Sequence, residues 1–84
     1  MSLSDVTLSR QFEDIEFIHG QFKWQPDKIM HKHYRTILIS LCKRILECEE
    51  FQRMLKQEGI YMEQIKVIRQ KISEVQRDIE TYVG

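Results

Sequence analysis

Alanine and asparagine are absent from this 84-residue chain, proline occurs once and glycine occurs three times. Without alanine, helices cannot approach one another very closely, so the interfaces between them have to be wide and filled by isoleucine, leucine, phenylalanine and methionine. The chain also lacks an apolar run near the roughly 18 residues that a transmembrane helix needs. Its N-terminus has no basic region followed by an apolar stretch, so no signal peptide is expected.

An excess of either charge is missing as well, because 13 basic residues balance 13 acidic ones. A neutral chain argues against a protein built mainly to coat nucleic acid or a membrane surface. Charged residues make up 31% of the chain, but the aliphatic content is too high for simple disorder. The length allows one domain at most, a single helical domain over 1–84, whose core is expected to be thin.

Cysteine occurs only at Cys42 and Cys48. On one helix these side chains would lie about 9 Å apart along the axis, beyond the reach of a disulfide. We therefore expect two reduced core residues. Their reduced state indicates an intracellular protein, either cytoplasmic or nuclear.

Apolar residues repeat with the helical period along three segments, which predicts helices over about 4–22, 27–58 and 61–82. The central segment carries apolar residues across an arc of about 140°, wider than a surface helix needs, so it should pack against two neighbours. The last segment has the cleanest repeat, a heptad seam that alternates by four and three. This seam consists of Tyr61, Ile65, Ile68, Ile72, Val75, Ile79 and Tyr82.

Residues that favour helix starts lie close to two of these boundaries. The first helix has three possible caps, a capping box between Ser2 and Asp5 or a lone cap at Ser4 or Thr7. Pro26 is expected at the first position of the central helix, where proline is favoured.

Gly59 is the expected stop of the central helix, because the apolar repeat changes phase there. A glycine at a phase break favours a turn, although one long helix bent at this point stays open. Net charge alternates in sign along the chain, which favours antiparallel neighbours through many weak pairs. The predicted architecture is all-α: a three-helix antiparallel bundle or a helical hairpin, with a coiled-coil-like C-terminal helix.

Nothing in the sequence has the pattern of a catalytic or metal centre. His31 and His33 diverge by about 200° on a helix, whereas ligands that share a face are three or four residues apart. The chain has no glycine-rich phosphate loop, no nucleophile elbow and no HExxH motif. We therefore expect no enzyme, no metal site and no cofactor.

A basic stripe on the central helix supplies an alternative function. Lys28, Lys32 and Arg35 follow one another at i, i+4 and i+7, a pattern found on nucleic-acid-binding surfaces. The neutral chain favours a different interpretation, a solvated face that pairs with acidic residues of the first helix. A small nucleic-acid-binding factor remains the alternative, and nucleic acid is not the expected partner.

Large apolar residues on otherwise polar faces are the most informative feature. Ile39 and Leu46 are seven apart, so they stack on the polar side of the central helix. Phe17 and Val67 likewise point away from the apolar stripes of their helices. Several such residues on a short chain indicate contact with another chain. The predicted partner-binding residues are Phe17, Ile39, Leu46, Phe51 and Val67.

These observations favour a protein–protein interaction module, a helical adaptor, regulator or oligomerisation domain that acts by packing helix against helix. Affinity would come from isoleucine, leucine and phenylalanine, and charge would set the register. The expected partner is another protein chain, in a homodimer or a heteromeric complex, with no membrane involved. The strong heptad near the C-terminal end leaves open that the chain is a fragment of a larger protein.

Overall fold

The computed structural model describes residues 7–81, and within this range the chain is helical apart from its short connections. The helices are α1 (Leu8–Trp24), α2 (Lys28–Glu47), α3 (Glu49–Lys56) and α4 (Glu58–Thr81). The predicted all-α fold class is confirmed. The predicted number of helices is wrong, because the segment predicted as one central helix forms both α2 and α3.

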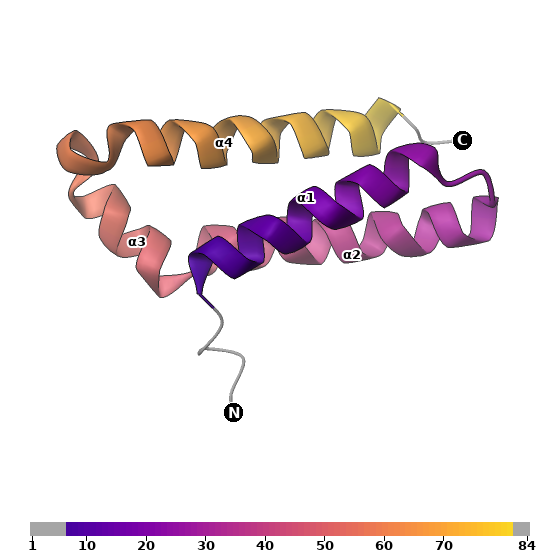
Figure 1. The fold of residues 1–84 in the computed structure, drawn as a ribbon, viewed down its shortest axis with the longest axis horizontal. Helices are drawn as coiled ribbons and strands as arrows, with labels where there is room; N and C mark the ends of the chain where they lie inside the picture. Colours follow the sequence, from indigo (N-terminus) through magenta and orange to yellow (C-terminus); the bar gives the residue numbers. More distant parts are fainter. Residues whose placement is uncertain (1–6, 82–84) are drawn as a thin grey trace.

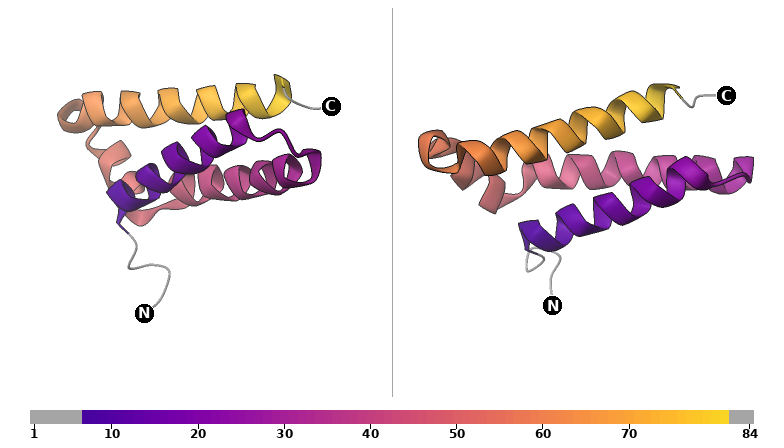
Figure 2. Two further views of the ribbon diagram at one scale, coloured as in Figure 1. Left: turned by 45° about the vertical axis from the view of Figure 1, so that its right-hand side comes forward. Right: turned by 45° about the horizontal axis from the view of Figure 1, so that its top comes forward.

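The four helices form an antiparallel arrangement around α2 (Figures 1 and 2). α1 and α2 make a hairpin, α3 crosses one end of it, and α4 returns antiparallel to α2. α2 contacts α1, α3 and α4, so it has packing partners on more than one side, as its wide apolar stripe predicted. The molecule is flat, with Cα extents of 41 × 30 × 15 Å. A flat arrangement leaves long stretches of helix surface in contact with solvent.

Polar groups satisfy the first backbone amides of α1. The Thr7 hydroxyl accepts a hydrogen bond from the amide three residues on, at 3.2 Å, which confirms Thr7 as the cap. The Leu8 amide donates to the Glu50 carboxylate of α3 at 3.1 Å, so α3 also helps to hold the start of α1. The capping box between Ser2 and Asp5 and the cap at Ser4 lie outside the described residues.

Asp27 caps the start of α2, and Pro26 lies outside the helix. The Asp27 carboxylate accepts hydrogen bonds from the amides of Ile29 and Met30, at 2.8 and 3.1 Å. Pro26 lies just before this cap, so its predicted place at the first helical position is wrong. An aspartate at the cap offers a strong acceptor to the free amides, which explains why the helix starts at Lys28, two residues later than with Pro26 at the first position.

The chain bends after α2 because Cys48 takes an extended conformation, with φ −61° and ψ 130°. In a straight helix Phe51 and Met54 would point about 120° or more away from the buried stripe around Ile45. The bend turns both side chains into the core. Burial of each contributes about 1.5–3 kcal/mol, which offsets the backbone hydrogen bonds lost at the bend. The predicted unbroken helix over 27–58 is therefore wrong.

A second change of direction separates α3 from α4. α3 ends at Lys56 with Gln57 as its C-cap, and α4 has a non-helical residue at Tyr61, with φ −104° and ψ 20°. The chain turns here, as predicted, instead of continuing as one bent helix. Gly59 lies inside the first turn of α4 and has no positive φ, so the turn does not depend on a glycine.

The core follows the predicted stripes of the first and last helices. On α1 the buried residues are Leu8, Ile15, His19 and Phe22. On α4 they are Ile65, Ile68, Ile72, Val75 and Ile79. The heptad seam of the last helix is thus confirmed as the face that packs, and Tyr82 of the predicted seam lies outside the described residues.

Candidate functional site

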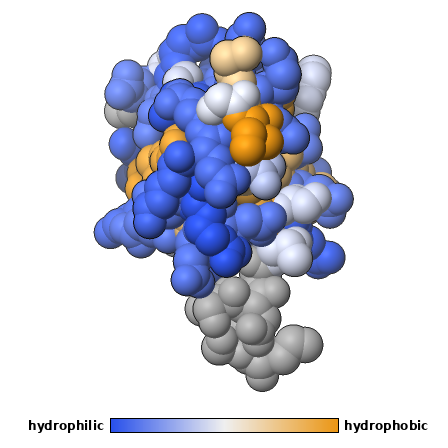
Figure 3. All heavy atoms as spheres, turned by 90° about the vertical axis from the view of Figure 1, so that its left-hand side faces the viewer, coloured by the Kyte–Doolittle hydropathy of each residue, from blue (hydrophilic) through white to orange (hydrophobic). Residues whose placement is uncertain are grey.

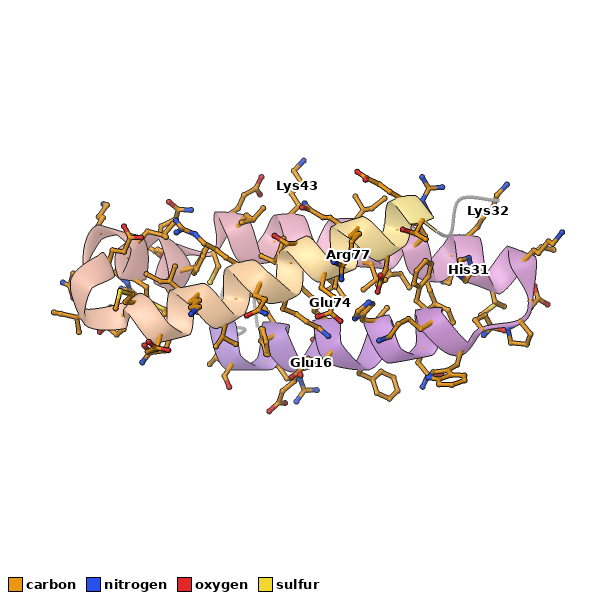
Figure 4. The ribbon with its side chains drawn as sticks, turned by 90° about the horizontal axis from the view of Figure 1, so that it is seen from above. Glu16, His31, Lys32, Lys43, Glu74 and Arg77 are labelled. Atoms are coloured by element: carbon orange, nitrogen blue, oxygen red, sulfur yellow. The ribbon has the colours of Figure 1, made fainter. Side chains whose placement is uncertain are left out.

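The side of α2 that points away from α1 carries two of the predicted contact residues. Ile39 is 51% exposed and Leu46 is 41% exposed. In Figure 4 Lys32 and Lys43 project from α2 on the side opposite α1, and the helical period puts the two apolar residues on this same side. We call Lys32, Ile39, Lys43 and Leu46 the α2 outer face. It is an apolar pair framed by lysines.

The other predicted contact residues lie apart from this face. Phe17 is an exposed residue of α1 and Val67 an exposed residue of α4. Phe51 is only 1% exposed, so it belongs to the core and its predicted role in partner binding is wrong. The prediction placed Phe51 on a straight helix, and the bend at Cys48 reverses which way it points.

A groove lies where the start of α1 meets α3 and α4. Its volume is about 500 Å³, and its walls are mostly apolar. Glu50 and Glu63, both exposed, also line it. Figure 3 views the molecule from the end where α3 and α4 meet and shows hydrophobic residues among hydrophilic ones. The apolar walls come from Leu8, Phe12, Met54, Tyr61, Val67 and Ile68.

The basic stripe of the alternative function is only partly presented to solvent. Lys28 and Lys32 are exposed, whereas Arg35 is half-buried. The Arg35 Nε is a buried atom with no hydrogen-bond partner among the described residues. Nothing in this geometry favours nucleic acid over a protein surface as the ligand of these residues.

A polar cluster joins α1 to α4 around His19, which is 1% exposed. His19 Nε2 lies 2.7 Å from Asp78 Oδ2, and Lys71 Nζ lies 3.0 Å from His19 Nδ1. An ammonium has no lone pair to accept with, so Nδ1 accepts from Lys71. Neutral His19 therefore carries its proton on Nε2 and donates it to Asp78.

Glu74 completes this cluster, which we call the His19 cluster: His19, Lys71, Glu74 and Asp78. Ligand atoms of His19, Glu74 and Asp78 all lie within 4.8 Å of one another. Figure 4 shows Glu74 between α4 and α1, whereas Glu16 points to the outer side of α1. Glu74 is half-buried, and its carboxylate makes no hydrogen bond or ion pair with another residue of the described range. The cluster holds two carboxylates for one ammonium.

The His19 cluster could not be predicted from the sequence, because His19 and Asp78 are 59 residues apart along the chain. Two signals were present. His19 falls within the apolar stripe of α1, where a polar residue needs a partner. Lys71, Glu74 and Asp78 follow one another at i, i+3 and i+7 beside the heptad seam, which puts three charged groups at the edge of a buried face.

The two cysteines differ in their surroundings. Both are free thiols, with Cys42 buried and Cys48 half-buried. Desolvation by burial raises the pKa of the Cys42 thiol. Cys48 lies at the bend, where its Sγ is 3.9 Å from Gln11 Nε2 of α1.

None of the helices in the described range combines the length and the apolar content that crossing a membrane would require. Comparisons with protein-family models, with curated protein sequences and with solved structures find no match for this chain.

Proposed function

We propose that this chain is a protein–protein interaction module that binds its partner through the α2 outer face. The observation that carries this proposal is the amount of apolar surface left uncovered. Within residues 7–81, nine large apolar side chains are exposed, against thirteen hydrophobic residues in the core. A chain this short has little stability to spare, so burial of this apolar surface against another chain would stabilise it.

Among these exposed residues, Ile39 and Leu46 form the best contact surface because they stack on one face. Lys32 and Lys43 beside them favour a partner that presents carboxylates. Adaptor, regulator and oligomerisation roles all fit this chemistry. The shared mechanism is helix-to-helix burial of the apolar pair, with the lysines setting the register.

The simplest partner is a second copy of the chain. A two-fold interface uses the same patch twice, so Ile39 and Leu46 of one copy would pack against those of the other. Such an approach places the lysines of the two copies near each other, so the apolar pair has to supply the affinity of a dimer. A specific dimer of this kind should bury more than about 1,000 Å² in total.

The test is the molar mass of the full chain, measured by light scattering during size-exclusion chromatography. We expect a dimer, and we expect the double variant Ile39→Lys, Leu46→Lys to elute as a monomer with a lower melting temperature. The matched control is Ile29→Lys with Ile60→Lys, which adds the same charges at two other exposed isoleucines. A dimer lost equally in both pairs would show that net charge, not this face, decides assembly.

A wild-type chain that stays monomeric at high concentration would rule out self-association. A double variant that melts at the wild-type temperature would confirm that outcome. A different protein would then be the partner of the α2 outer face, and affinity capture with Ile39→Lys, Leu46→Lys as the comparison would identify it. Capture that is equal for wild type and variant would sink the proposal.

A further inference from the structure

We propose that the His19 cluster binds a divalent first-row metal ion, held by His19 of α1 together with Glu74 and Asp78 of α4. This inference is independent of the proposed function, because none of these residues belongs to the α2 outer face.

The first argument is the donor set and its geometry. One imidazole nitrogen and two carboxylates suit Zn²⁺ and neighbouring first-row ions. Metal–ligand distances near 2.1 Å put two ligands of one ion at most about 4.2 Å apart. The donor atoms here already lie within 4.8 Å of one another. Small side-chain rotations therefore suffice to close the site around an ion.

The second argument is the balance of charge. With His19 neutral, Lys71 contributes one positive charge and Glu74 and Asp78 one negative charge each, a net charge of −1. Glu74 and Asp78 are also i and i+4 on α4, an arrangement in which like charges repel. The Asp78 carboxylate accepts a hydrogen bond from His19, whereas the half-buried Glu74 carboxylate accepts none from another residue of the described range. A cation between the two carboxylates removes this repulsion.

Lys71 makes the metal compete with an internal cation. A metal on Nε2 takes the place of the proton there, and the neutral imidazole then carries its proton on Nδ1. Nδ1 can no longer accept from Lys71, so the ammonium has to leave it, which its flexible stem permits. Binding therefore exchanges the contact between Lys71 and His19 for a metal bridge between α1 and α4. Three protein ligands leave a further coordination position for water.

The experiment is a calorimetric titration of the EDTA-stripped full chain with ZnCl₂, accompanied by thermal melts. We expect one equivalent to bind and the melting temperature to rise. Glu74→Gln and Asp78→Asn should each weaken binding by at least about tenfold, because each removes a ligand of the ion. The matched control is Glu63→Gln, which removes an exposed carboxylate elsewhere on α4 and should bind zinc as the wild type does.

Lys71→Met supplies a test with the opposite sign. The variant lacks the ammonium that repels the metal ion. It also lacks the hydrogen bond to Nδ1 that keeps the proton of His19 on Nε2, where the metal has to bind. Zinc should therefore bind more tightly to Lys71→Met. A Co²⁺ spectrum separates the proposed site from the cysteines, because a thiolate ligand adds sulfur-to-metal charge-transfer bands in the near ultraviolet. We expect Co²⁺ bands in the visible region and no thiolate charge-transfer bands.

Four results would overturn the proposal. They are no binding at all, wild-type affinity in Glu74→Gln and Asp78→Asn, unchanged or weaker affinity in Lys71→Met, and thiolate charge-transfer bands. Circular dichroism of each variant verifies that the helices remain, so that a loss of affinity reports on ligands rather than on unfolding.

Discussion

Cys42 of α2 lies in the core, and the burial of its thiol leads to a prediction about this single residue. Desolvation raises its pKa in the folded chain, so folding favours the protonated thiol. The corresponding stability is fully present below the unfolded pKa, near the ordinary thiol value of 9.0, and is lost as the pH rises through the higher folded pKa. Because the thiolate is the nucleophile, the folded chain should also protect Cys42 from alkylation.

The measurement is the rate of iodoacetamide labelling at pH 8 in Cys48→Ser, which leaves Cys42 as the single thiol. We expect labelling at least about tenfold slower in the folded chain than in guanidinium, since reaction needs the core to open. Cys42→Ser, which leaves half-buried Cys48, is the control and should show less protection. Equal rates in folded and unfolded Cys48→Ser would show that Cys42 is not in a closed core.

Single residues were predicted well where periodicity alone decides their place. The stripe from Leu8 to Phe22 and the isoleucines of α4 required no information beyond their spacing. His19 falls within this stripe as well. Its partners could not be predicted, because they depend on how α1 and α4 approach each other in space and not on any spacing within one helix.

At the scale of helices, the two described glycines have no structural role that needs glycine. Neither Gly20 in α1 nor Gly59 in α4 has a positive φ, and a Cβ at either position would meet nothing within 4 Å. Alanine should therefore be tolerated at both. Since alanine loses less backbone entropy in a helix, each change should stabilise the chain, by about 0.5–1 kcal/mol at the interior position Gly20 and by less at Gly59.

Chemical denaturation of Gly20→Ala and Gly59→Ala, monitored by circular dichroism, measures these changes. A clear loss of stability in Gly59→Ala would restore the glycine-dependent turn that the sequence suggested. Unchanged stability in both would mean that the gain in entropy is lost elsewhere in the fold.

The bend between α2 and α3 shows where prediction from periodicity failed. The apolar repeat changes phase between α2 and α3, since Phe51 and Met54 fall outside the stripe around Ile45, but no proline or glycine between Lys28 and Lys56 marks the place. Charge did carry a signal. Arg44 occupies the last turn of α2, and Glu49 and Glu50 the first turn of α3, which is the arrangement that two separate helix dipoles favour.

At the scale of the whole molecule, the flat arrangement explains why exposed apolar residues were easier to predict than the surfaces they belong to. Ile39 and Leu46 lie on the flank of the buried stripe of α2, and both are partly exposed in the fold. The groove between α1, α3 and α4 depends on the bend at Cys48, so it could not be predicted without it. The fold class and the packing faces followed from the sequence, whereas the meeting of distant segments required the structure.

The buried histidine has a consequence for how α4 finds its place along the rest of the molecule. The seam of α4 is nearly repetitive, so a slip of one heptad, about 10 Å, would replace most isoleucines by similar side chains. A slip that brings Lys71 to the place of Asp78 would leave His19 buried without its acceptor, a loss of about 1–3 kcal/mol. A single polar residue in an apolar seam can fix an alignment in this way.

His19→Leu should therefore keep the helices but allow α4 to take more than one alignment along α1. Spin labels at exposed Glu16 and Arg77, in a chain with both cysteines replaced by serine, should give one narrow distance distribution with His19 present. With leucine at 19, we expect a broad or double distribution. An equally narrow distribution in both chains would mean that the apolar residues of α4 already distinguish one alignment from the next. If the distribution broadens, the polar contact between His19 and Asp78 contributes less to the stability of the fold than to its specificity, because it selects one of several alignments of nearly equal free energy.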